Sequence, residues 1–65
     1  MRMEFYDELG ALKRGIDEAE YYLDGILLDQ ATEDKVLDCI EDAEAAVSRL
    51  RQLAEDIFNA ANAQA

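Results

Sequence analysis

Residues 5–26, FYDELGALKRGIDEAEYYLDGI, place apolar side chains after alternating steps of four and three residues. An α-helix turns once in 3.6 residues, so this series forms a stripe along one side of a helix. Sustained seven-residue repeats of this kind are typical of a helix packed lengthwise on another helix. The stripe consists of Phe5, Leu9, Leu12, Ile16, Ala19, Leu23 and Ile26.

The second half of the chain repeats the pattern with Val36, Ile40, Ala43, Val47, Leu50, Ala54 and Ile57. A short link joins the two stripes, and short links favour antiparallel neighbouring helices. Thr32 is a residue type that caps helix N-termini, so it is the expected cap of the second helix. The sequence thus predicts an all-α fold, an antiparallel two-helix hairpin in a single domain over residues 1–65. We expect helix 1 at about 3–28, the turn at about 29–32 and helix 2 at about 33–60.

The two stripes also predict how the helices pair. Facing residues of an antiparallel hairpin have a nearly constant sum of residue numbers. Pairs from Ile26–Val36 through Ala19–Ala43 to Phe5–Ile57 all sum to 62 or 63, and each pairs apolar with apolar. This register places a layer of small side chains at Ala19 and Ala43.

The chain is too short to bury a large core alone. It has 65 residues, a single cysteine, Cys39, and no histidine, so it has neither an internal disulfide nor the commonest transition-metal ligand. Further apolar and small residues flank both stripes, as in helices of larger bundles. We therefore expect a homodimer in which two hairpins form a four-helix bundle. The expected dimer interface consists of Gly15, Tyr22, Cys39, Ala46, Leu53 and Phe58.

This architecture resembles that of the Rop family of plasmid copy-number regulators, dimers of helical hairpins with layered small and large core residues. That family binds paired RNA loops through polar and basic residues of its first helix. Here the first helix is rich in acids and holds only Lys13 and Arg14 beside Arg2. The resemblance implies the bundle design, and no RNA-binding residue is carried over.

The net charge is −10, from 16 acidic and 6 basic residues. Residues 17–44 hold eleven acids and a single base, Lys35, which gives −10, whereas the acids and bases of the remaining segments balance. This acidic half is either a solubilising surface or a docking site for a basic protein. Small acidic inhibitors encoded by phages, including anti-CRISPR proteins, have similar size and charge. The candidate partner-binding residues are Asp17, Glu18, Tyr21, Asp24, Asp34, Asp38, Glu41 and Asp42.

The sequence shows no arrangement of residues suited to catalysis. Ser48 and Cys39 have no histidine to activate them, and the three glycines are isolated. We expect no catalytic residues, no cofactor, no metal site, no direct nucleic-acid binding and no membrane span. The predicted function is a cytoplasmic inhibitor or regulator of a host protein, in the host cytoplasm if phage-encoded. The alternatives are a Rop-like bundle that contacts structured RNA and a structural subunit of a larger assembly.

Overall fold

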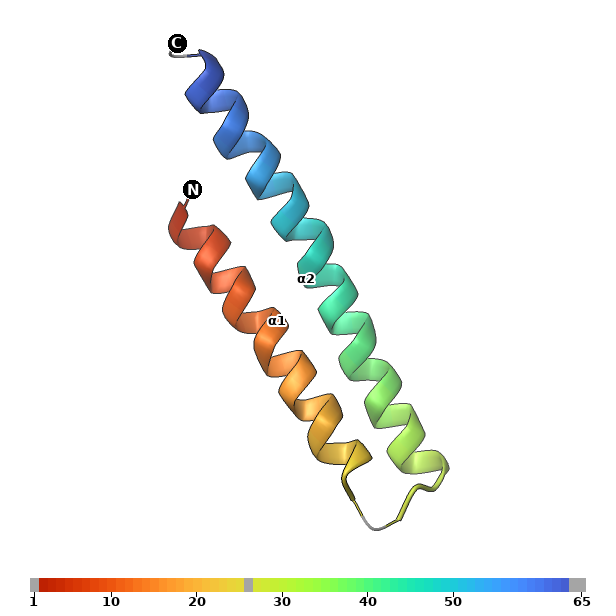
Figure 1. The fold of residues 1–65 in the computed structure, drawn as a ribbon. Helices are drawn as coiled ribbons and strands as arrows, with labels where there is room; N and C mark the ends of the chain where they lie inside the picture. The colour runs from red at the N-terminus through yellow and green to blue at the C-terminus, as the bar shows by residue number, and fades with distance from the viewer. Residues whose placement is uncertain (1, 26, 64–65) are drawn as a thin grey trace.

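The structure is a computed structural model that describes residues 2–25 and 27–63. It contains two helices, α1 (Arg2–Leu23) and α2 (Gln30–Ala63), which pack side by side and antiparallel (Figure 1). The Cα atoms span 55 × 14 × 11 Å, so the molecule is a rod. The all-helical hairpin expected from the two stripes is therefore confirmed. Within the described residues, neither helix has a stretch long and apolar enough to cross a membrane.

The turn lies earlier in the chain than expected. Helix α1 ends at Leu23 and not near residue 28. Just after Leu23, the N–H of Asp24 still donates to the carbonyl of Glu20 at 2.9 Å. The N–H of Gly25 then bonds only three residues back, to Tyr22 at 3.3 Å. Glycine loses more conformational entropy in a helix than any other residue, so Gly25 disfavours a further turn. Asp24 also places a negative charge at the negative C-terminal end of the helix dipole. The helix therefore stops there.

Asp29, and not Thr32, caps helix α2. The carboxylate oxygen Oδ1 of Asp29 accepts from the backbone N–H of Thr32 at 2.9 Å and lies 2.8 Å from its hydroxyl. That hydroxyl proton is shared with the carbonyl of Leu27, 3.1 Å away. A side-chain acceptor three residues before a free N–H is the usual geometry of an N-cap. The two bonds from Thr32 hold the pKa of Asp29 below its ordinary value.

The register in the middle of the hairpin differs from the one predicted by more than one helical turn. A Cβ built on Gly15 would lie 3.4 Å from the carbonyl oxygen of Cys39 and 3.7 Å from Cβ of Ala43. Glu8 pairs with Arg49 farther along. These partners have residue numbers that sum to 54, 58 and 57, where 62 or 63 was expected. In this central part α1 is shifted along α2 by about six residues, or roughly 9 Å. At the termini end Phe5 and Ile57, a predicted pair, still line one groove.

The side of each helix that faces the other also differs from the prediction. The residues buried between the helices are Gly15, Val36, Cys39, Ala46 and Leu50. Four residues of the predicted stripes are instead exposed: Ile16 (47%), Leu23 (55%), Ile40 (42%) and Val47 (50%). Ile26, a further member, lies outside the described residues. The contact therefore combines small residues, which let the helix backbones approach closely, with the larger Val36 and Leu50.

Candidate functional site

All eight candidate residues of the acidic surface are exposed. Helix α1 presents Asp17, Glu18 and Tyr21, and Asp24 follows its last residue. On α2, Asp34, Asp38 and Glu41 follow one another by four and three residues, so they share one side of the helix. Asp42 completes the set. The prediction that these residues are accessible to a partner is consistent with their exposure, and their binding role stays a prediction.

The structure brings only some of these residues together across the two helices. Glu18 and Asp42 line one shallow groove between α1 and α2, with Arg14 and Arg49 also in its wall. Tyr21 and Asp24 line another groove, at the turn. The first groove mixes both signs of charge. The purely acidic surface is therefore the outer side of α2 together with the outer side of α1, and not the groove between them.

Tyr21 is the most exposed aromatic residue of this surface, at 75%. Its ring meets the ring of Tyr22 edge to face, with centroids 5.4 Å apart and planes at 72°. The ammonium of Lys35 lies 5.3 Å from the centroid of Tyr22, within the range of a cation–π contact. The single base of the acidic half, Lys35, therefore lies against the ring of Tyr22 on the other helix.

A cross-helix ion pair lies on the same long side of the rod as Glu18 and Asp42. Nε of Arg49 is 2.8 Å from Oε1 of Glu8. The other oxygen, Oε2, is buried and has no hydrogen-bond partner among the described residues. Sequence reasoning missed this pair, because two residues 41 positions apart give no local pattern. The observed register brings the two residues together, since their residue numbers sum to 57, close to the sums at the contacts of Gly15.

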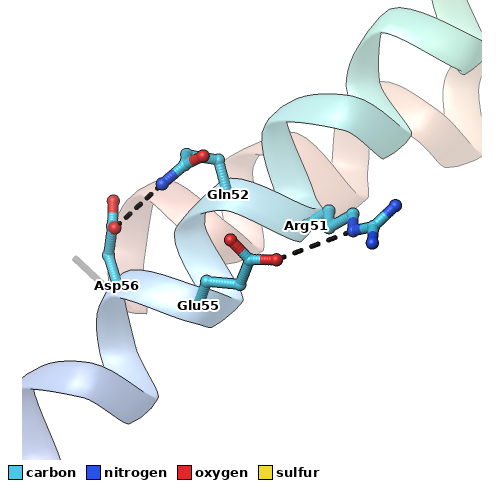
Figure 2. Close-up of polar contacts among 4 residues, drawn as sticks. All are labelled: Arg51, Gln52, Glu55 and Asp56. Atoms are coloured by element: carbon cyan, nitrogen blue, oxygen red, sulfur yellow. Dashed lines mark hydrogen bonds and ion pairs between the residues drawn. The ribbon is translucent and has the colours of Figure 1, made fainter.

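The terminal part of α2 holds its charges in local pairs. Arg51 lies 3.6 Å from Glu55, and the amide of Gln52 donates to Asp56 at 3.0 Å (Figure 2). Both pairs join residues four apart on one helix, and such exposed pairs contribute little to stability. Only the first pair joins opposite charges; the termini half is neutral because the segments outside residues 17–44 hold equal numbers of acids and bases.

Cys39 lies in the contact between the helices. Its thiol faces Glu18, with Sγ 3.8 Å from Oε2. Burial raises the pKa of the Cys39 thiol, and the negative charge of Glu18 raises it further. The thiol therefore stays protonated near neutral pH, and a protonated thiol is a poor nucleophile.

Three of the six residues expected at a dimer interface are buried inside the hairpin instead, and the interface itself stays a prediction. Gly15, Cys39 and Ala46 are buried between α1 and α2, and Tyr22 and Leu53 are half-buried. Only Phe58, at 69% exposure, remains open to a second chain. Flanking small residues were assigned to the wrong contact because the large aliphatic residues were assumed to face the other helix of the same chain.

Comparisons with protein-family models, with curated proteins and with solved structures return no match. Across residues 2–25 and 27–63, no three or more Cys, Asp or Glu side chains gather in a way that could hold a metal ion.

Proposed function

We propose that the chain is a small non-enzymatic interaction protein that inhibits or regulates a protein with a basic surface. In this proposal it acts in the cytoplasm as a homodimer, two hairpins that form a four-helix bundle. The observation that supports it is the charge separation: residues 17–44 carry −10, and the eight candidate residues are exposed, seven on α1 or α2 and Asp24 just after α1.

Binding would be driven by complementary charge. A concentrated negative surface attracts a basic groove, raises the association rate and loses both effects as salt increases. Helix α2 holds Asp34, Asp38 and Glu41 on one side, so they reach the partner without first being ordered. A groove that ordinarily holds nucleic acid is the kind of site such a row would fit, because carboxylates can take the place of phosphates there.

The test compares two variants of equal charge change. In the first, Asp34, Asp38 and Glu41 become lysine. In the second, three exposed acids outside the acidic half, Glu4, Asp7 and Glu55, become lysine. Proteins captured from the native host by the wild-type chain should be retained by the second variant and lost by the first, and their retention should weaken with salt. Equal retention by both variants would assign the acidic half to solubility alone.

A parallel measurement addresses direct RNA contact. Fluorescence polarisation with labelled RNA hairpins at low salt should show no saturable binding, because a net charge of −10 repels a polyanion. Tight and hairpin-specific binding would overturn the proposal in favour of a Rop-like role.

A further inference from the structure

One long side of the rod is an exposed apolar surface that both helices share. We call it the apolar face. A groove at the termini end is lined by Phe5 of α1 and Phe58 of α2, and a groove at the turn end by Leu23 and Val36. Phe5 and Leu23 are 18 residues apart, which is about five full helical turns, so both lie on the same side of α1. Between the grooves, steps of three, four or seven residues continue the face with Leu9, Leu12, Ile16, Ile40, Val47 and Ala54.

The hairpin leaves far more surface exposed than a compact protein of its mass. Its accessible surface is 5243 Å², whereas a compact monomer of 7.3 kDa exposes roughly 4,200 Å². The apolar side chains buried within the described residues are only Val36, Cys39, Ala46 and Leu50, and none of the large ones is completely buried. The small contact between α1 and α2 is marginal for a chain that folds alone, so we expect another protein surface to pack on the apolar face.

We infer that a second copy of this chain covers the apolar face, with the turns of the two hairpins at opposite ends of the bundle. This inference rests on the homodimer of the proposed function and specifies its surface and geometry. The excess surface is about 1,000 Å² per chain, and so about 2,000 Å² for two. Stable interfaces bury about 1,200–2,000 Å² in total, so the available area is sufficient.

The two ends of the face complement each other. The termini groove carries the aromatic side chains of Phe5, Tyr6 and Phe58 with Arg2 at its edge. The turn groove is aliphatic, formed by residues that include Leu23, Leu28 and Leu37, and has acids at its edge, Asp29 and Glu33. With the hairpins reversed, the aromatic end of each copy lies over the aliphatic end of the other, and Arg2 approaches Asp29 and Glu33.

Net charge selects the same arrangement. Turns at the same end would place two segments of −10 beside each other, whereas reversed hairpins place each acidic half beside a neutral terminal half. Like charges at this density repel strongly at low salt. A single twofold axis then relates the copies, and it crosses the face near Val47, the middle of α2, so that the same patch serves both chains.

The first experiment uses the wild-type chain. Light scattering after size exclusion should give about 14.6 kDa, twice 7.3 kDa, and the Tm should rise with protein concentration, because dilution dissociates a dimer. A mass of 7.3 kDa with a Tm independent of concentration would overturn the inference. That result would favour a larger assembly as the occupant of the face and would leave the acidic-surface proposal standing.

A pair of variants tests which face is covered. Ile16→Glu puts a charge in the apolar face and should weaken dimerisation by at least a hundredfold. The control Ala45→Glu adds the same charge on the exposed polar side of α2, where it should leave the mass unchanged. If Ile16→Glu stays dimeric, or Ala45→Glu becomes monomeric, the assignment of the face is wrong. Should Ile16→Glu fail to fold, the wild-type concentration series still decides the oligomeric state.

Spin labels test the orientation. Gln30→Cys in a Cys39→Ala background, first confirmed to be a dimer, places one label at the turn of each hairpin. Reversed hairpins predict a label separation close to the 55 Å length of the rod. A separation below about 20 Å, two helix diameters, would overturn the reversed arrangement. Lysine at Asp34, Asp38 and Glu41 should not change this distance, which keeps the dimer test independent of the partner-binding test.

Discussion

The two long sides of this hairpin are built from the same helices and differ in nearly every respect. The apolar face presents Ile16, Ile40 and Val47, which are between 42% and 50% exposed. The opposite side, which we call the polar face, holds the Glu8–Arg49 ion pair and the groove that contains Glu18 and Asp42. Between the two sides runs a narrow contact in which Gly15 lies against the backbone of α2.

This difference shows what a heptad stripe encodes. The large stripe residues Ile16, Ile40 and Val47 stay exposed, whereas Val36 and Leu50 are buried against the neighbouring helix of the same chain. In the proposed four-helix bundle these exposed residues would face the centre, which lies between all of its helices. The contact within the hairpin is marked by small residues that permit close approach, at Gly15, Cys39 and Ala46.

The largest effect is expected from the contact between the helices. Leu50→Ala should lower the free energy of unfolding by about 2–5 kcal/mol, because Leu50 is buried at 9% exposure and its removal leaves a cavity. The matched control Leu27→Ala, at 69% exposure and outside the apolar face, should cost about 1 kcal/mol or less. Urea denaturation followed by circular dichroism measures both. Equal losses would mean that Leu50 is not part of the main contact.

Two glycines of α1 should respond in opposite ways. Gly15→Leu should cost about 1–3 kcal/mol, because a Cβ there already reaches the backbone of α2 at 3.4 Å. Gly10→Ala should stabilise by about 0.5–1 kcal/mol, since its added Cβ meets only the flexible end of Arg14 at 3.5 Å. The same denaturation experiment applies. Stabilisation by both substitutions would show that the helices do not approach closely at Gly15.

The polar face should contribute less. Arg49→Met keeps the stem of the side chain and removes the partner of Glu8, with an expected cost of about 1 kcal/mol that shrinks in high salt. Arg51→Met is the control, because its pair with Glu55 is long and exposed, and its cost should be close to zero. A double substitution of Glu8 and Arg49 yields their coupling. If the effects of the two single substitutions simply add, the ion pair does not contribute to stability.

The smallest expected effect concerns the Cys39 thiol. Burial and Glu18 raise the pKa of Cys39, so the folded state favours the protonated form. The resulting contribution to stability is present below the ordinary thiol pKa of 9.0 and is lost as pH rises through the folded-state value. Stability should therefore fall more above pH 9.0 in the wild type than in Cys39→Ala. Iodoacetamide should also react slowly in native buffer and quickly in denaturant, and equal rates would contradict the burial.

Much of the fold followed from the sequence alone. The alternating steps of four and three predicted two helices, and the short link predicted their antiparallel packing. The register could not be predicted in the same way. The constant sum of residue numbers was applied to the large apolar residues, which were assumed to face each other inside one chain. Gly15 has no side chain and so adds nothing to a hydrophobic pattern, although α1 lies against the backbone of α2 at this residue. The cap was misplaced because Asp29 and Thr32 are both good N-cap residues and only the geometry distinguishes them.

The candidate site was predictable to a different degree. The excess of acids over residues 17–44 is visible in the sequence, and their exposure follows from their placement off the apolar stripe. The grouping of Glu18 with Asp42 depends on the register and on which side each helix turns inward, so the sequence could not give it. The same holds for Lys35 over Tyr22, a contact between residues on different helices.

Helix α2 is longer than α1, and its last residues extend past the start of α1 (Figure 1). Residues 59–63 are all exposed, so no neighbour in the same chain supports them. A helical end without tertiary contacts frays in water, because nucleation and propensity alone hold short helices only marginally. Amide protons there should exchange with solvent fastest in an isolated hairpin. Slow exchange in this segment would thus reveal a neighbour along the overhang, without any change to the sequence.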